Sequence, residues 1–219
     1  MFCKFLLLIS FTLCSFAEAY PTLYTETNQL LKSQATQLDR LSILNDSSVW
    51  YFNFIAQSSY RKDPGSVVTA SAVNFPAVIG NGMSLALITL APCGILPAHI
   101  HPRAANYVIA TKGSTRTYFY EENGAKLIVN TLTPNTMTIF PQAVLHTMFN
   151  EGCTEATLVS ALSSEDPGTL TFANSFFELP IDLVSNAFGG DISSFRSRVP
   201  NLASNAIAGT RDCLARCRK

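Results

Sequence analysis

Histidine is the residue type in this chain whose spacing could do chemistry. The chain contains three histidines, at positions His99, His101 and His146. Residues two apart in a β-strand point to the same face, so His99 and His101 would present two imidazoles side by side. His146 lies in 145–149, a later run that is also predicted to be a strand. Three imidazoles that converge inside a barrel would form a transition-metal site.

The histidines alone also fit structural roles. An H-x-H pair is often solvated on an exposed strand, and a single histidine among apolar residues is often a hydrogen-bonded core residue. The sequence around them must therefore distinguish metal binding from packing. No H-E-x-x-H, P-loop, G-x-G-x-x-G, G-x-S-x-G or C-x-x-C motif offers another catalytic template.

The middle of the chain has the pattern of an all-β domain. Short β-branched and aromatic runs alternate with Gly, Pro and Asn, which predicts a sandwich or barrel. Glu122-Asn-Gly124 favours a hairpin turn, because Asn-Gly tolerates positive φ values. The expected strands are 67–71, 83–90, 107–111, 114–120, 127–131, 136–140, 145–149 and 156–160.

Helical patterns flank this β region. Apolar residues recur at helical spacing from about Tyr24 to Leu44, which predicts one amphipathic helix packed on something larger. A second helix is expected over 181–188 with Gly189 at its end, and a last helical stretch is expected after Pro200, running into Cys213. These flanks hold too little apolar sequence for a core of their own.

The first 19 residues have the layout of a secretory signal peptide. Lys4 supplies a positive charge, 5–16 is an apolar run too short to span a bilayer, and Ala17-Glu-Ala19 is an A-x-A cleavage site. We expect secretion with a mature chain from near Tyr20, although an uncleaved N-terminal anchor is the alternative. Nothing later reads as a membrane span. We predict a signal peptide over 1–19, a helical arm over 20–49, a barrel over 50–175 and a C-terminal helical segment over 176–219.

Secretion would expose the chain to oxidation and glycosylation. Four cysteines would remain after cleavage, an even number that suits disulfides: Cys93, Cys153, Cys213 and Cys217. Three pairings are open, and we favour Cys93 with Cys153 and Cys213 with Cys217, because sequence neighbours need little chain movement to meet. An i,i+4 pair would be strained in a regular helix, so the second bridge requires an irregular turn. Asn45 heads the N-x-[ST] sequon of the chain and is the expected glycosylation site.

The composition of the chain argues against nucleic acid as a partner. The chain has 15 Lys+Arg against 15 Asp+Glu, a net charge of +0, and only 14% charged residues. It therefore lacks the basic face that a nucleic-acid binder uses. Apolar residues make up 47% of the chain, which argues against a disordered protein.

The sequence around the first two histidines resembles the first box of the cupin family, in its germin and spherulin branch. That box reads G-x5-H-x-H, then three or four residues, E, six residues and G. Here His99-Ile-His101-Pro-Arg-Ala and Gly113 fall in register. Cys93 stands at the first Gly, and Asn106 stands at the Glu.

The sequence around the third histidine resembles the second box of the same family, G-x5-P-x-G-x2-H-x3-N. Pro141, His146 and Asn150 match this pattern, while Asn135 and Ala143 stand at its two glycines. The leading signal peptide and the flanking helical segments also look germin-like. The resemblance therefore spans nearly the whole mature chain.

The resemblance implies an all-β fold, the double-stranded β-helix or cupin jelly-roll barrel, with one metal ion. His99, His101 and His146 would ligate that ion, which is typically manganese in germins, with Asn106 at the fourth ligand position and Asn150 near the pocket. A neutral Asn amide is a weaker ligand than a Glu carboxylate. Three imidazoles and an amide therefore also suit zinc, copper, nickel or iron.

The pocket walls bear on the reaction. Germins that oxidise oxalate carry Asn three and thirteen residues before the first histidine, where this chain has Leu96 and Ala86. Neither side chain can hydrogen-bond a carboxylate, so the sequence argues against oxalate oxidase activity. Superoxide dismutation is the oxidoreductase activity to test first, because it needs only a redox metal and an open site. Arg103 could attract an anion or form a surface ion pair.

The resemblance also implies self-association into trimers or hexamers outside the cell or in the cell wall. Leu183, Phe188 and the leading helix are the candidate contacts. Two non-catalytic alternatives remain. In one the protein is a spherulin-like storage or stress protein, which the loss of Glu at Asn106 favours. In the other it is a cell-wall or surface adhesion component.

Overall fold

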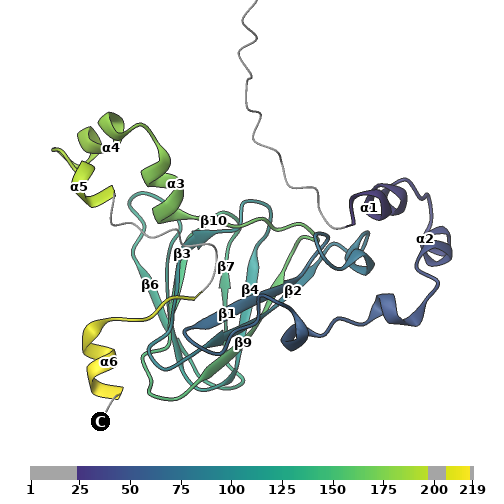
Figure 1. The fold of residues 1–219 in the computed structure, drawn as a ribbon, viewed down its shortest axis with the longest axis horizontal. Helices are drawn as coiled ribbons and strands as arrows, with labels where there is room; N and C mark the ends of the chain where they lie inside the picture. Colours follow the sequence, from purple (N-terminus) through teal and green to yellow (C-terminus); the bar gives the residue numbers. More distant parts are fainter. Residues whose placement is uncertain (1–23, 197–205, 218–219) are drawn as a thin grey trace, which may run out of the picture.

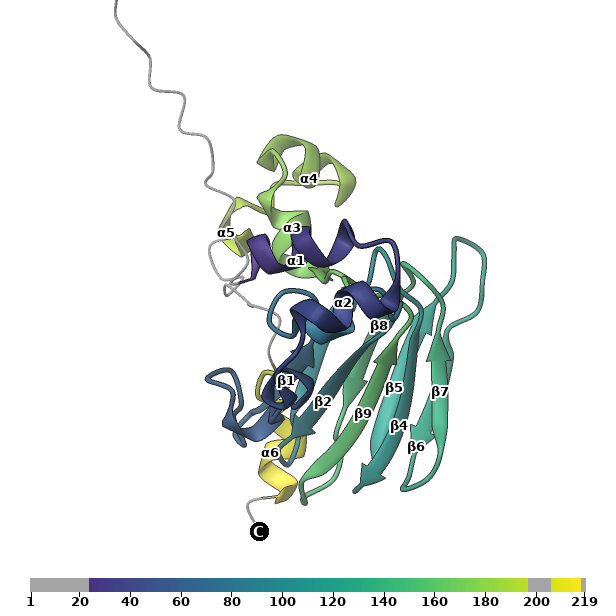
Figure 2. The ribbon, with the colours of Figure 1, turned by 90° about the vertical axis from the view of Figure 1, so that its right-hand side faces the viewer.

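Two antiparallel β-sheets packed face to face make up the body of the molecule (Figure 1). The computed structural model describes residues 24–196 and 206–217. Within them, one five-stranded sheet has the order β1-β2-β9-β4-β7 and the other the order β10-β3-β8-β5-β6. Figure 2 shows β2, β9, β4 and β7 side by side in the first sheet. The expected all-β barrel with helices at both ends is confirmed.

Every strand expected from the sequence is present to within a few residues, and β3 and β10 are added. The strands are β1 (Gly65–Ala70), β2 (Ser84–Leu90), β3 (Ile95–Ile100), β4 (Asn106–Lys112), β5 (Thr115–Tyr120), β6 (Ile128–Leu132), β7 (Met137–Phe140), β8 (Leu145–Phe149), β9 (Ala156–Leu162) and β10 (Leu170–Thr171). The helices are α1 (Thr25–Lys32), α2 (Gln37–Ile43), α3 (Phe172–Glu178), α4 (Ile181–Ala187), α5 (Ser193–Arg196) and α6 (Arg211–Cys217), with short 3-10 turns η1 (Ser47–Trp50), η2 (Phe54–Ala56) and η3 (Pro76–Val78). The Asn-Gly turn joins β5 to β6, which pair antiparallel.

The core lies between the two sheets. Strands β4 and β9 alternate buried and more exposed residues, so one row of side chains from each points inward. Ile88, Val108, Phe140, Met148 and Leu158 are among the residues of this core. Each such side chain contributes about 1.5 to 3 kcal/mol when removed from water.

The single N-terminal helix expected over 24–44 is wrong, because the segment forms two helices. Thr36 begins the second one with a capping box: its hydroxyl accepts from the N–H of Asp39 at 3.2 Å, and the Asp39 carboxylate accepts from the N–H of Thr36 at 3.2 Å. This local arrangement ends the first helix before residue 36. Leu31 and Leu44 are buried against Ile79 in a small second cluster.

The C-terminal segment begins with a helical projection, α3 to α5, which we call the arm (residues 172–196). It extends away from the barrel (Figure 1). Helix α4 ends before Gly189, whose φ of 73° supports the expected stop. The last helix begins only at Arg211, since Ile207 before it pairs with Ile95 in an extended bridge. Pro200 and the expected signal peptide over 1–19 lie outside the described residues.

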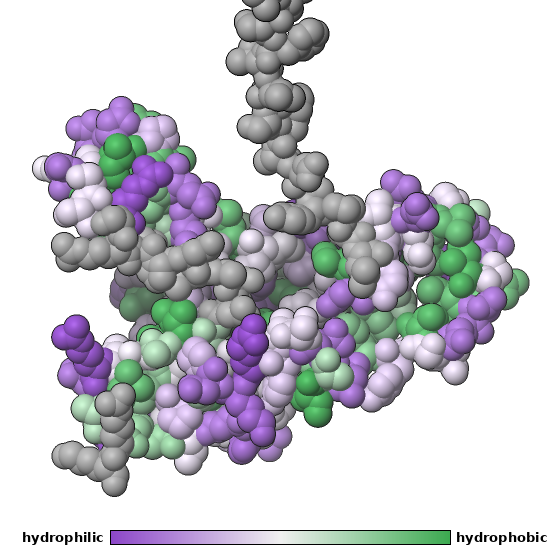
Figure 3. All heavy atoms as spheres, viewed as in Figure 1, coloured by the Kyte–Doolittle hydropathy of each residue, from purple (hydrophilic) through white to green (hydrophobic). Residues whose placement is uncertain are grey.

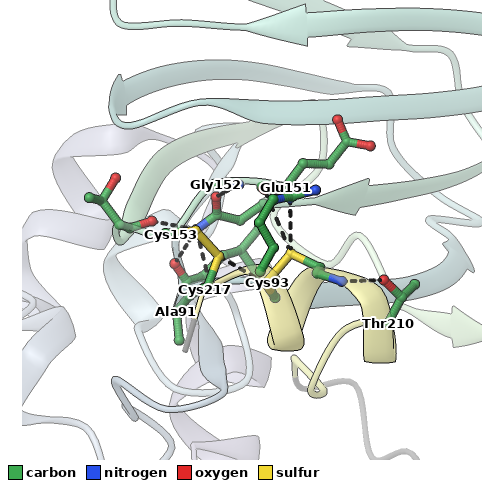
Figure 4. Close-up of a disulfide and its surroundings, with 12 residues drawn as sticks. Ala91, Cys93, Glu151, Gly152, Cys153, Thr210 and Cys217 are labelled. Atoms are coloured by element: carbon green, nitrogen blue, oxygen red, sulfur yellow. Dashed lines mark hydrogen bonds between the residues drawn. A yellow bond between two sulfur atoms is a disulfide. The ribbon is translucent and has the colours of Figure 1, made fainter. Parts of the chain in front are cut away.

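The disulfide pairing expected from sequence proximity is wrong. The bonds join Cys93 to Cys213 and Cys153 to Cys217, with Cα–Cα distances of 5.8 and 5.0 Å. Cys213 and Cys217 lie about one turn apart on the same side of α6, and each is bonded to a different loop of the barrel. Figure 4 shows Cys217 beside Cys153 and Cys93. The two bonds fasten α6 to the β2–β3 and β8–β9 loops. Within the described part of the chain, no helix combines the length and apolar character of a membrane span.

Candidate metal centre

Strands β3 and β8, which carry His99 and His146, are neighbours in the second sheet, and His101 directly follows β3. β3 and β8 pair antiparallel, and His99 lies directly opposite His146. The ring centroids of these two residues are 4.1 Å apart, and those of His101 lie 5.0 Å from His99 and 5.3 Å from His146. Each ring offers a nitrogen within 4.8 Å of the others. The structure thus brings together the three imidazoles that the sequence singled out.

Backbone carbonyls orient all three rings. The Nδ1 atom of His99 lies 2.7 Å from the carbonyl oxygen of Pro97, and that of His146 lies 2.9 Å from the carbonyl oxygen of Val144. His101 Nδ1 lies 2.7 Å from the carbonyl oxygen of Gly168, on the segment that leads into β10. A carbonyl oxygen only accepts, so each Nδ1 carries the proton and each Nε2 keeps a free lone pair.

One of these nitrogens is buried without a partner. His146 is only 2% exposed, and among the described residues its Nε2 atom has no hydrogen-bond partner. Leaving a buried polar atom unsatisfied costs about 1 to 3 kcal/mol. A metal ion bound to this lone pair would satisfy it. The donor set therefore fits the metal that the sequence suggested.

Burial keeps the triad in the neutral form that ligates metals. Loss of solvation, together with the neighbouring imidazoles, lowers the pKa of His99 to about 4 and that of His146 to about 2. Burial also lowers the pKa of His101. The three rings therefore need not lose protons to bind a cation at neutral pH.

The ring of Phe140 stacks on the ring of His146 and helps to hold it in place. The two rings stack with centroids 4.2 Å apart and an interplanar angle of 22°. Phe140 is fully buried on β7, in the opposite sheet. The sequence analysis did not single out this residue. The inward position of Phe140 in the alternation of β7 would have placed it in the barrel, but not against a histidine.

A cavity of about 70 Å³ opens beside His99 and His101, and His146 is not among the residues that line it. Its apolar walls include Leu96 and Ala86, the two positions where an amide would be needed for oxalate. Within the described ranges, no Asp, Glu, Lys or Arg lines it. The other lining residues are Val67, Thr69, Ile88, Pro97, His99, His101, Asn106, Met148, Ser160, Leu162, Thr169 and Thr171.

Asn106 reaches the cavity from the opposite sheet. It is the first residue of β4 and is only 2% exposed. Its Oδ1 atom accepts a hydrogen bond from the Ser160 hydroxyl on β9 at 2.5 Å. The oxygen that would ligate a metal is thus already engaged on one side by Ser160.

Two other residues from the sequence analysis have structural roles. Asn150 does not line the cavity, and its amide nitrogen donates to the carbonyl oxygens of Leu90, Ala91 and Thr154 at 2.8 to 3.1 Å. It therefore ties the β2–β3 and β8–β9 loops together. Arg103 forms an exposed ion pair with Asp166, at 3.0 Å, and does not line the cavity.

The three positions where this chain replaces a glycine of the family boxes share one backbone conformation. Cys93, Asn135 and Ala143 have φ values of 61°, 70° and 61°, and they are the non-glycine residues with positive φ in the described ranges. This left-handed region strains residues that carry a Cβ. The Ala143 N–H donates to the carbonyl oxygen of His101 at 3.0 Å, so one strained turn adjoins a candidate ligand. The glycines missing from the boxes were a signal for these turns that the sequence analysis did not use.

Comparison with known proteins agrees with this architecture. The family model described as cupin matches residues 52–194. Spherulin-1A of Physarum polycephalum is 35% identical over 191 residues, which cover 86% of this chain and 77% of the relative. The putative germin-like protein 3-2 of Oryza sativa subsp. japonica is 34% identical over 144 residues, which cover 62% of this chain and 64% of the relative.

A solved oxalate oxidase has the same fold. It superposes with a TM-score of 0.65 at 23% identity, covering 72% of this chain and 84% of the other. The chain belongs to the cupin family. Its two-sheet barrel and its paired histidine-bearing strands lie within the segment that the family model matches. Within that family its relatives are spherulins and germin-like proteins.

Proposed function

We propose that the protein is a secreted germin-like metalloprotein that binds one divalent metal ion through His99, His101 and His146. The observation that carries this proposal is the buried Nε2 of His146, which has no hydrogen-bond partner in the described part of the chain, in a triad whose Nδ1 atoms all face backbone carbonyls. Manganese is the metal expected from the family resemblance. Neutral imidazoles also suit zinc, copper, nickel and iron.

The reaction we propose is the dismutation of superoxide, in which two superoxide ions and two protons give dioxygen and hydrogen peroxide. A redox metal would supply the electron exchange. The triad would hold the ion, the backbone carbonyls would keep the rings aligned, and the apolar walls would limit entry to small species. The cavity of about 70 Å³ leaves room for a diatomic ion. Leu96 and Ala86 offer no donor to a dicarboxylate, which argues against oxalate as substrate.

The test is a metal analysis of the purified, secreted protein and of two variants. We expect about one metal ion per chain in the wild type and almost none in His146→Ala. The matched control is Thr115→Val, which changes a buried barrel residue that does not line the cavity. It should keep the metal. A wild type that binds no metal after loading, or a His146→Ala variant that keeps it, would refute the site.

Dismutase activity is then measured before and after chelation. Activity that is lost with the metal and restored by reloading supports the oxidoreductase. A loaded protein no more active than the same concentration of free metal ion supports a second candidate, a spherulin-like storage or stress protein. One observation favours this candidate: apart from the imidazoles, no titratable side chain among the described residues lines the cavity to move protons.

We also propose that the arm mediates self-association, into a trimer or hexamer by analogy with germins. Its side chains Leu183 and Phe188 are 60% and 61% exposed, and the rings of Phe176 and Phe177 contact the ring of Phe188. Figure 3 shows hydrophobic residues on this arm and on the end that carries α2. Burying such side chains against another copy would remove apolar surface from water.

Two other features of the chain support export outside the cell or to the cell wall. The two disulfides require an oxidising compartment to form, and Asn45 is exposed between α2 and η1, where a glycan would not clash with the barrel. Peptide mapping of the secreted protein, with and without glycosidase treatment, tests the start of the mature chain and the glycan together. An intact N-terminus at Met1 and an unmodified Asn45 would overturn both parts.

A further inference from the structure

We propose that Cys153 is a modification site, at which a small monothiol forms a mixed disulfide and starts an exchange that reaches the buried bond of Cys93. The site is separate from the metal centre. Cys93 precedes the first residue of β3, whereas His99 lies near the last. The chemistry is thiol–disulfide exchange, in which a thiolate attacks one sulfur of a disulfide and expels the other.

The four sulfur atoms form a continuous path from the surface to the interior. Cys153 is exposed and is bonded to Cys217. Cys93 and Cys213, which are bonded to each other, are only 0% and 3% exposed. The Sγ atom of Cys217 lies 3.6 Å from that of Cys93, so the two disulfides are in van der Waals contact. Figure 4 shows Cys217 next to both Cys153 and Cys93.

The first step takes place at the exposed bond. The thiolate of the monothiol attacks Sγ of Cys153, a new sulfur–sulfur bond forms between them, and the bond to Cys217 breaks. Both electrons of the broken bond stay on Cys217, which leaves as a thiolate, and the proton of the monothiol passes to water. Access decides which sulfur is attacked, and Cys153 is the more exposed residue of the pair.

Other contacts hold the last helix in place when that bond opens. The bond between Cys213 and Cys93 is still closed and anchors α6 about one turn before Cys217. Ile207 and Ile95 exchange two backbone hydrogen bonds, of 2.8 and 2.9 Å, ahead of the helix. The Cys217 thiolate therefore stays beside Cys93. A nucleophile held against its target reacts far faster than the same group free in solution.

The second step moves the exchange into the interior. The Cys217 thiolate attacks Sγ of Cys93, a bond forms between them, and Cys213 leaves as a thiolate with both electrons of the bond it loses. A guanidinium nitrogen of Arg216 lies 3.5 Å from Sγ of Cys213 and stabilises the negative charge there. Exchange is faster when the leaving sulfur is a more stable thiolate. The product carries the monothiol on Cys153 and a free thiolate at Cys213.

The test treats the folded, disulfide-intact protein with increasing concentrations of reduced glutathione in the presence of a metal chelator. Acid stops the exchange, the free thiol of the first product is alkylated after unfolding in acid, and mass spectrometric peptide mapping locates it and the adduct. We expect glutathione on Cys153 and the free thiol on Cys213, in about tenfold excess over Cys217. A neighbouring cation changes the ionisation of a thiol by a factor of about ten or more.

Two variants of α6 isolate the role of the cation. Arg216→Gln removes the guanidinium beside the sulfur, so the ratio of free thiol on Cys213 to that on Cys217 should fall about tenfold. The matched control is Arg211→Gln, which removes a cation from the same helix that makes no hydrogen bond to a sulfur atom among the described residues. This control should keep the wild-type ratio.

A double variant tests the passage between the two bonds, and it decides together with the wild-type map if Arg216→Gln fails to fold. Cys93→Ser/Cys213→Ser removes the buried disulfide but keeps the exposed one. Glutathione should still add to Cys153, and the free thiol should then remain on Cys217.

Each contrary outcome overturns a stated part of the proposal. In the wild type, a free thiol on Cys217 with the buried bond intact overturns the passage to the interior. An adduct on Cys217 in place of Cys153 overturns the assigned site. An unchanged thiol ratio in Arg216→Gln overturns the role of the guanidinium. A protein that takes up no glutathione at any concentration at which it stays folded overturns the proposal as a whole.

Discussion

The metal-free protein should lose stability as the pH falls from 6.5 to 5. In the folded protein the pKa of His99 is lowered to about 4 and that of His146 to about 2, against 6.5 for the unperturbed side chain. Between these values the unfolded chain binds protons that the folded chain does not, so acid favours unfolding. At about 1.4 kcal/mol per pH unit, each histidine lowers the free energy of unfolding by about 2 kcal/mol at pH 5. Together they lower it by about 4 kcal/mol, a large share of typical stability.

The assay is urea denaturation of the chelator-treated, disulfide-intact protein at pH 8, 6.5 and 5. The chain has three histidines in all, and most carboxylates titrate below this window, so the slope reports on the triad. The double variant His99→Gln/His146→Gln should have a clearly shallower profile, in which only His101 still contributes to the slope, whatever its absolute stability. A wild-type profile that stays flat to pH 5, or a double variant with the wild-type slope, would refute this reasoning.

Three further predictions concern single residues. Ala143→Gly should raise the free energy of unfolding by about 1 kcal/mol, because Ala143 is strained at a φ of 61°; a lower urea midpoint would contradict this. Thr115→Val should also stabilise by about 1 kcal/mol, since the Thr115 hydroxyl is buried without a partner among the described residues, and calorimetry showing a lower Tm would count against it. Phe188→Asp should reduce the mass measured by light scattering towards that of one chain, whereas Tyr51→Asp, at a site 71% exposed near the other end, should not. An unchanged mass for Phe188→Asp would exclude the arm as the contact.

The sequence predicted the features of the fold that depend on local patterns. Alternating apolar residues marked the strands, and the spacing of His99 and His101 placed two imidazoles on one face. That His146 joins them depends on the pairing of β3 with β8, a contact between distant segments. Periodicity carries no information about such pairing. Only the resemblance to the family boxes predicted it.

The wrong disulfide pairing has the same cause. Which cysteine meets Cys93 depends on how the last helix docks, and that docking involves the bridge between Ile207 and Ile95 and the face of α6 that carries both Cys213 and Cys217. The separation of the cysteines along the sequence carries no information about this docking. The break between α1 and α2 was, by contrast, visible in the sequence as the Thr36-x-x-Asp39 pattern, which resembles a capping box. Because only the helical periodicity of the apolar residues was considered, the segment was predicted as one helix.

The way the triad is held explains how the chain can differ from its family and still gather its histidines. The Nδ1 partners of the three rings are backbone carbonyls, and a backbone carbonyl remains when side chains change. The left-handed turns at Cys93, Asn135 and Ala143 likewise keep their conformation without glycine, at a cost in strain. Position 106 has no part in orienting the rings. A substitution there therefore changes the charge of the centre and the ligands it needs, while the three nitrogens stay where the sheet holds them.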